Sequence, residues 1–81
     1  MRVTMRLFAG HRERAGTDRL QLDLPNDSTA HDAFLALAQR YPALGETEPF
    51  TTFARNRQVV GPAEPLGDGD EVALLQPVSG G

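Results

Sequence analysis

The chain has 81 residues and no cysteine, so it is the size of one small domain and can hold neither a disulfide nor a zinc–thiolate site. All eight of its cationic side chains are arginine, and its net charge of −3 argues against a nucleic-acid partner. No apolar run approaches the ~20 residues that span a bilayer, and no signal peptide opens the chain, so we expect a cytoplasmic protein with no membrane partner.

The first part of the chain alternates apolar and polar residues twice, in residues 2–8 and again in residues 19–24. Such alternation predicts two half-buried strands. Residues 9–16 between them are polar and contain two glycines, so we expect a loop with one helical turn. This loop is too long for a tight hairpin, but it allows the strands to pair as antiparallel neighbours. The apolar positions on one face are Val3, Met5 and Leu7 in the first strand and Leu20, Leu22 and Leu24 in the second.

A turn at residues 25–28 leads into a predicted helix. Thr29 is the candidate N-cap, and Asp32 three residues later is the acidic partner of a capping box. Pro42 ends the helix, because the residue before a proline avoids helical dihedral angles. We expect an apolar stripe on this helix to cover the leucine face of the two strands. The stripe consists of Ala30, Ala33, Phe34, Leu37, Ala38 and Tyr41.

The second half of the chain carries weaker patterns. Residues 44–52 predict a loop, and residues 53–60 predict a strand or a hairpin bent around Asn56-Arg57. A glycine-rich turn at residues 67–70 precedes a final strand over residues 71–76, in which Val72 and Leu74 share one face. This order of elements predicts an α+β fold, with one main helix packed on a mixed sheet of four to five strands.

Few side chains inside this fold suggest chemistry. His11 and His31 lack the further ligands that a metal needs, so both are expected at the surface. Asp68, Asp70 and Glu71 lack the loop of an EF-hand, so they are interpreted as an acidic turn. The sequence therefore predicts no metal site, no bound cofactor and no enclosed active site.

The end of the chain is the remaining chemical feature. Gly80-Gly81 closely follows the predicted final strand, and two terminal glycines occur by chance in about one chain in two hundred. Residues 77–81 reach about 17 Å when extended, and glycine presents the slimmest possible backbone to a cleft. A frayed terminus is the ordinary alternative. The pattern favours a carrier whose C-terminal carboxylate is activated by another protein.

Over its whole length the sequence resembles the small sulfur-carrier subunits of molybdopterin synthase, which are ubiquitin-like β-grasp proteins. The resemblance implies a β-grasp domain over residues 1–76 and a flexible, extended C-terminal tail over residues 77–81. One departure is Gln76-Pro77, which stands where the family has two prolines and removes one locked φ angle. The matching segments are Leu7-Phe8-Ala9, Arg12-Glu13, Gly16, Asn56, Leu66, residues 68–72 and Pro77-Val78-Ser79-Gly80-Gly81.

The resemblance also implies a chemical cycle. A ubiquitin-activating-like adenylyltransferase uses ATP to adenylate Gly81, and a sulfur donor converts the adenylate into a thiocarboxylate. The tail then enters the large subunit of molybdopterin synthase, where sulfur passes to cyclic pyranopterin monophosphate and forms the molybdopterin dithiolene. The chain is therefore expected to be a covalent sulfur carrier and not itself an enzyme. The large subunit is expected to supply the catalytic acid and base, in a heterotetramer of two small and two large subunits.

Strand alternation predicts a docking patch beside the tail. If the core strands turn Leu7 and Leu74 toward the helix, then Phe8 and Leu75 point away from it, and Val59 is expected to join them. The same positions match the partner-facing residues of the family that the sequence resembles. The alternative is that scattered exposed apolar residues are ordinary. With the patch, the predicted partner-binding residues include Pro77, Val78, Ser79 and Gly80.

Three other functions remain open at this point. The chain is also compatible with a sulfur carrier for transfer-RNA thiolation, cysteine synthesis or thiazole synthesis. The second is a ubiquitin-like modifier that forms isopeptide bonds with lysines, and a plain interaction module with frayed glycines is the third. The mass of the C-terminal peptide separates a carrier from a modifier.

Overall fold

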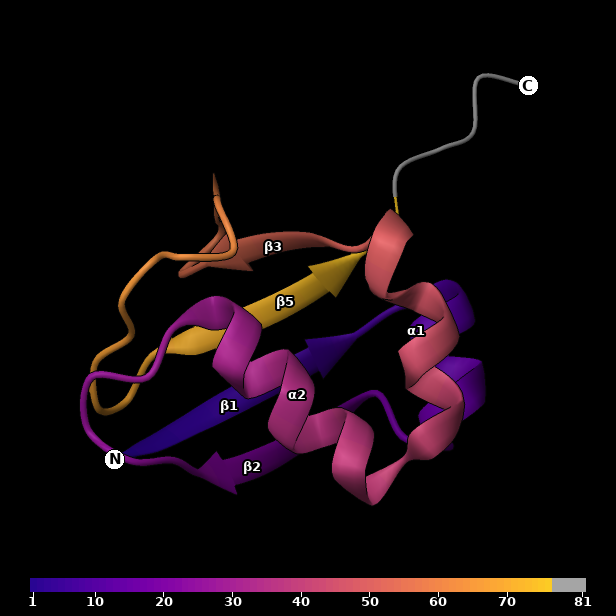
Figure 1. Ribbon diagram of the computed structural model, residues 1–81, viewed down its shortest axis with the longest axis horizontal. Helices are drawn as coiled ribbons and strands as arrows, with labels where there is room; N and C mark the ends of the chain where they lie inside the picture. Colours follow the sequence, from indigo (N-terminus) through magenta and orange to yellow (C-terminus); the bar gives the residue numbers. More distant parts are fainter. Residues whose placement is uncertain (77–81) are drawn as a thin grey trace.

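The computed structural model describes residues 1–76, and the predictions for Pro77, Val78, Ser79, Gly80 and Gly81 lie outside this range (Figure 1). Two α-helices, one 3-10 helix (η1) and five strands follow one another along the chain. Their bounds are β1 (Arg2–Leu7), α1 (Ala9–Ala15), β2 (Arg19–Asp23), α2 (Ala30–Arg40), η1 (Pro42–Phe50), β3 (Thr52–Arg55), β4 (Gln58–Val60) and β5 (Glu71–Leu75).

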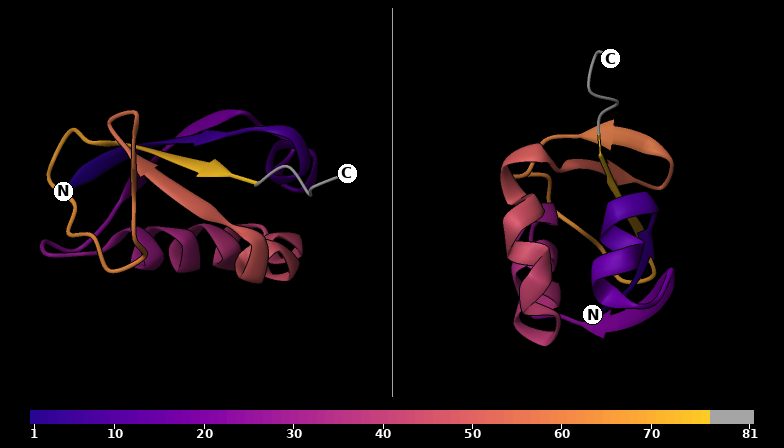
Figure 2. Two further views of the ribbon diagram at one scale, coloured as in Figure 1. Left: turned by 90° about the horizontal axis from the view of Figure 1, so that it is seen from above. Right: turned by 90° about the vertical axis from the view of Figure 1, so that its right-hand side faces the viewer.

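The five strands form one mixed sheet in the order β2-β1-β5-β3-β4. The two central strands, β1 and β5, are parallel, with Met5 opposite Val72 and Leu7 opposite Leu74, whereas the other three pairs are antiparallel. Figure 2 shows α2 and η1 on one side of the sheet and α1 at the end of β1. The predicted α+β class, with one main helix on a mixed sheet, is confirmed. We call the side of the sheet turned away from α2 its outer face.

The core lies between the sheet and α2. The expected inward face of β1 is confirmed, since Val3, Met5 and Leu7 are each at most 1% exposed. Phe34 of α2 is equally buried and meets Phe53 of β3 edge to face, with 6.3 Å between the ring centroids. Burying one such side chain contributes about 1.5–3 kcal/mol, so α2 is held mainly by this apolar stripe.

Local signals position both ends of α2 as predicted. The Asp32 backbone N–H donates to Thr29 Oγ1 over 3.2 Å, and the Thr29 N–H donates to Asp32 Oδ2 over 2.9 Å, which completes the capping box. These bonds lower the pKa of the Asp32 carboxyl. The helix ends at Arg40, two residues before Pro42. No helix within residues 1–76 combines the length and the apolar character needed to cross a membrane.

The loop predicted for residues 44–52 is wrong, because this segment lies largely within η1. Leu44 is fully buried against the core and fixes the first turn of η1. The Thr47 hydroxyl then donates to the Leu44 carbonyl over 2.6 Å, and the Thr51 hydroxyl donates to the Thr47 carbonyl over 2.7 Å. These local bonds satisfy backbone carbonyls that 3-10 geometry would otherwise leave weakly paired.

The loop with one helical turn predicted for residues 9–16 is also wrong, because α1 occupies residues 9–15. Gly16 closes it with φ of 73°, a left-handed angle that suits glycine, and its N–H donates to the Arg12 carbonyl over 2.8 Å. The surface position expected for His11 is wrong as well, since His11 is 0% exposed. It packs between α1 and η1, with its Nε2 2.9 Å from Thr51 Oγ1.

The last part of the chain agrees with the sequence patterns. The predicted hairpin is formed by β3 and β4, and Asn56 and Arg57 connect them with φ angles of 50° and 70°. Positive φ at both positions is the geometry of a type I′ turn, whose twist matches that of paired strands. Val72 and Leu74 of β5 are fully buried, as predicted.

Candidate functional site

The candidate site lies where β1 and β5 end side by side. Leu7 pairs with Leu74 in the parallel ladder, so the next residues, Phe8 and Leu75, are neighbours at the end of the sheet. Phe8 is 41% exposed and Leu75 is half-buried. The structure therefore brings together two of the three residues of the predicted docking patch.

Val59, the third residue of the patch, lies farther away on the same face. Ala73 of β5 pairs with Ala54 of β3, and Ala54 pairs with Val59 of β4. Directly paired residues share a face of a sheet, so the two alanines join Leu75 to Val59 across three strands. Val59 is 67% exposed at the sheet edge. We call this row of residues, in which Ala54 is only 6% exposed, the apolar strip of the outer face.

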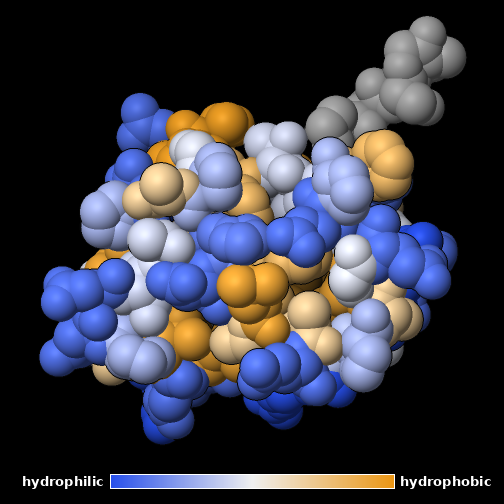
Figure 3. Space-filling view, in the orientation of Figure 1, coloured by the Kyte–Doolittle hydropathy of each residue, from blue (hydrophilic) through white to orange (hydrophobic). Residues whose placement is uncertain are grey.

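Charged side chains border this strip. The Arg6 guanidinium lies 5.5 Å from the centroid of the Phe8 ring, which is a cation–π distance. Arg6 also lies 3.7 Å from a Glu71 carboxylate oxygen on the neighbouring strand. An apolar centre with a polar border is the usual composition of a protein–protein interface. Figure 3 shows the opposite, α2-covered side, where polar residues separate the apolar ones.

The described chain ends at Gln76, whose side chain lies against the first turn of α1. A Cβ placed on Gly10 would come within 2.8 Å of Gln76 Oε1 and 2.9 Å of Arg14 Nη1. Sequence analysis missed this contact between the two ends of the chain. The two residues are far apart in the sequence, so no local pattern indicated the contact.

The acidic residues near β5 have a structural role at the other end of the sheet. Asp70 is 8% exposed and accepts hydrogen bonds from Arg55 Nε over 2.7 Å, from Asn56 Nδ2 over 3.0 Å and from the Gly67 N–H over 2.7 Å. Burial acts to raise the pKa of Asp70, but these hydrogen bonds outweigh it and the pKa is lowered. Within residues 1–76 no group of three or more metal-ligating side chains is found.

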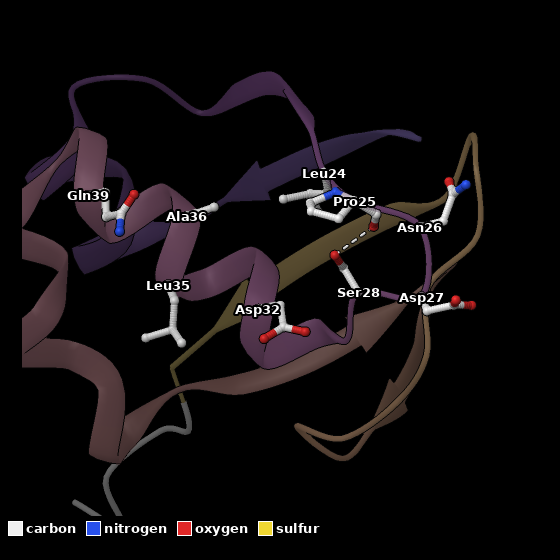
Figure 4. Close-up of a pocket in the computed structure, with 9 residues that line it drawn as sticks. All are labelled: Leu24, Pro25, Asn26, Asp27, Ser28, Asp32, Leu35, Ala36 and Gln39. Atoms are coloured by element: carbon white, nitrogen blue, oxygen red, sulfur yellow. Dashed lines mark hydrogen bonds between the residues drawn. The ribbon is translucent and has the colours of Figure 1, made fainter.

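Two surface hollows offer little chemistry. The larger, of about 460 Å³, lies between residues 24–28 and α2 (Figure 4). Its Ser28 hydroxyl donates to the Pro25 carbonyl over 2.7 Å, and its Asp32 carboxylate caps α2, so both groups are already used. The smaller, of about 310 Å³, is bordered by His31 and Glu48, which are 2.6 Å apart. His31 lies at the surface, as predicted.

Comparison with known proteins agrees with the resemblance seen in the sequence. The profile of the ThiS family matches residues 5–81. A molybdopterin synthase sulfur carrier subunit from Chlamydomonas reinhardtii is 35% identical over 83 residues, with 100% of both chains covered. These matches extend across the whole domain and include the candidate site.

Two further similar proteins, from Haloferax volcanii and Helicobacter pylori, have solved structures. Small archaeal modifier protein 1 of Haloferax volcanii is 37% identical over 84 residues, covering 94% of this chain and 97% of that protein. A crystal structure of SAMP1 from the same organism superposes with a TM-score of 0.86, at 35% identity and with 100% of both chains covered. A complex of subunits 1 and 2 of the molybdopterin-converting factor from Helicobacter pylori contains a chain with a TM-score of 0.70, 28% identity and 100% coverage of both chains. The expected ubiquitin-like β-grasp fold is confirmed.

Proposed function

The chain belongs to the ThiS family, and from this premise we propose that it is the sulfur-carrier subunit of a molybdopterin synthase. The observation that carries the proposal is the end-to-end similarity to a molybdopterin synthase sulfur carrier subunit. The apolar strip at the end of β5 supports it, because a carrier must dock on a partner close to the point where its reactive end begins.

The proposed reactive group is the carboxylate of Gly81, in the tail of residues 77–81 beyond the domain of residues 1–76. A carboxylate oxygen attacks the α-phosphorus of ATP on an adenylyltransferase and expels pyrophosphate. A sulfur donor then supplies a hydrosulfide equivalent that attacks the acyl carbon and expels AMP. The product is a thiocarboxylate, and no cofactor bound by this chain takes part. Glycine leaves the acyl carbon open on both sides.

The proposed acceptor complex is the large subunit of molybdopterin synthase, which would supply the acid and base for sulfur transfer to cyclic pyranopterin monophosphate. Phe8, Leu75 and Val59 are the proposed docking residues of the domain. Pro77, Val78, Ser79 and Gly80 are the proposed contacts of the tail. A similar protein supports this proposal, since the Helicobacter pylori structure is a complex of subunit 1 with subunit 2.

Mass spectrometry of the C-terminal peptide tests this function. The protein is incubated with ATP, its adenylyltransferase and a sulfur donor, and we expect the mass gain of one oxygen replaced by one sulfur. A variant that lacks Gly81 is the control and should gain no mass. The loaded protein is then mixed with a large subunit and cyclic pyranopterin monophosphate, and dithiolene product is expected. Sulfur delivered only to transfer RNA, a cysteine precursor or a thiazole precursor would contradict the acceptor assignment.

A second candidate function is that of a protein modifier, because the chain is 37% identical to small archaeal modifier protein 1. In that case Gly81 would form an isopeptide bond with a lysine of a target protein. Isolation of tagged protein from cells separates the two functions. Covalent conjugates that depend on Gly81, without thiocarboxylate on the free protein, would favour the modifier.

A further inference from the structure

Gln76 is the last residue that the structure describes, and it directly follows β5. Leu75 is the last residue of β5 and pairs with Thr52 of β3. Gln76 follows outside the ladder, and within residues 1–76 its backbone N–H has no backbone partner. Gln76 is exposed, and the contact that the structure gives its side chain is with α1.

That side chain lies against Gly10 of α1. A Cβ on Gly10 would stand 2.8 Å from Gln76 Oε1 and 3.9 Å from Gln76 Cδ. A separation of 2.8 Å is shorter than the contacts that Cβ atoms make in proteins, so one of the two atoms would have to shift. The Gln76 amide is the end of a flexible side chain, so it would have to move away if Gly10 carried a Cβ.

The Arg14 guanidinium lies beside the same position. Its Nη1 donates to the Gly10 carbonyl over 3.2 Å and would lie 2.9 Å from the added Cβ. The Arg14 guanidinium and the Gln76 amide are therefore both close to Gly10. Figure 2 shows α1 at the end of the sheet where β5 also ends.

The position of Gly10 is fixed by the residues on each side of it. Ala9 has φ of 45°, a left-handed angle that costs a residue with a Cβ about 1–2 kcal/mol, and this angle turns the chain sharply from β1 into α1. His11 follows and is fully buried against η1. Such strain persists only where the surrounding structure holds it.

We propose that Gly10 and Arg14 form a packing site for the Gln76 side chain, and that this site restrains the Gln76 backbone, to which the proposed reactive tail is joined. A proline in place of Gln76 would restrict the same backbone through its ring. Here a contact across the two ends of the chain supplies the restriction. Gly10 and Gln76 are thus positioning residues, and their effect on sulfur loading rests on the proposed function.

Gly10→Ala tests the packing site, with Gly61→Ala as the matched control. Gly61 has no atom within 4 Å of an added Cβ and no left-handed φ angle. The first measurement needs no partner: amide NMR shifts of residues 78–81 should change in Gly10→Ala and stay unchanged in Gly61→Ala. The atoms that Gly10→Ala displaces are the ends of flexible side chains, so the variant should keep its fold.

The second measurement is the rate of adenylation. We expect KM to stay within about twofold and kcat to fall by about three- to tenfold, because the change should affect how the C-terminal carboxylate is positioned for attack and not how the domain binds. Gln76→Ala should lower kcat similarly, and Gly10→Ala combined with Gln76→Ala should be no worse than Gln76→Ala alone. Gln76→Pro should restore kcat in the Gly10→Ala background.

The outcomes separate this inference from the proposed function. If Gly10→Ala and Gly61→Ala give the same NMR shifts at residues 78–81, the packing site is overturned. The same holds if the effects of Gly10→Ala and Gln76→Ala simply add. If the wild-type protein is never adenylated, the proposed function fails, while the NMR comparison still decides the packing site.

Discussion

The two ends of the sheet are built from different interactions. At the end where β5 begins, Asp70 gathers hydrogen bonds from Arg55 and Asn56, and the Gly69 N–H donates to the Arg2 carbonyl over 2.8 Å. At the end where β5 finishes, the neighbours are the exposed Phe8 ring, the half-buried Leu75 and the glycine at position 10. The first end is closed by directional bonds, and the second leaves apolar surface uncovered within the described residues.

This difference separates stability from recognition. A buried carboxylate with several donors fixes its surroundings, and removing it leaves those donors unpaired. Exposed apolar side chains contribute little to folding and gain their free energy when a partner covers them. Substitutions at the two ends should therefore change different measured quantities.

Asp70→Ala should have the largest effect, on stability. The change leaves the Asn56 amide and the Gly67 N–H without their acceptor and weakens the hold on Arg55. We expect the free energy of unfolding to fall by about 3 kcal/mol, measured by urea denaturation. Asp18→Ala, at an exposed position, is the control and should change it by less than about 0.5 kcal/mol. Equal effects of the two variants would contradict a special role for Asp70.

Leu75→Glu, at the other end of the sheet, should weaken partner binding and leave stability almost unchanged. A charge in the centre of the apolar strip should weaken binding to the large subunit by at least about tenfold, while the fold stays close to wild-type stability. Leu35→Glu is the matched control, because Leu35 is 43% exposed on α2, on the opposite side of the sheet. Titration calorimetry measures both affinities. Wild-type affinity in Leu75→Glu would remove Leu75 from the docking patch.

The pH dependence of stability should report on His11, which holds α1 against η1. Burial, followed by the nearby charge of Arg14, lowers the pKa of His11 below its ordinary value of 6.5. The unfolded chain therefore takes up this proton first, and stability should decrease as the pH falls below about 6.5. His11→Gln does not titrate and should flatten this part of the profile. Identical profiles for the two proteins would contradict the assignment.

Ala9→Gly should produce the smallest effect. Glycine removes the cost of the 45° φ angle but adds freedom to the unfolded chain. We expect the free energy of unfolding to rise by about 0.5–1 kcal/mol, measured as a shift of the urea midpoint. A loss of stability would show that the Ala9 side chain has a packing role that outweighs the strain.

Local patterns predicted much of the fold. The alternation in β1 and β5 identified the buried faces, and Thr29 with Asp32 marked the start of α2, because these signals lie within a few consecutive residues. The burial of His11 could not be predicted, since it depends on Thr51, far away in the sequence. The same holds for η1, whose first turn is fixed by contact of Leu44 with the core.

The candidate site, like the fold, was predicted only in part. Alternation placed Phe8 and Leu75 on the outer face, but their adjacency required the parallel pairing of β1 with β5. The contact between Gly10 and Gln76 joins the two ends of the chain and has no local signature. The tail predictions, from Pro77 to Gly81, stay predictions.

The central place of β5 has a mechanical consequence. Because β5 is bonded to β1 on one side and to β3 on the other, a force drawn along its axis through Gln76 loads both ladders in shear. The hydrogen bonds of both ladders then resist together, whereas an edge strand pulled along its axis would be held by one ladder only. A pull applied through Gln76 should therefore leave the domain folded.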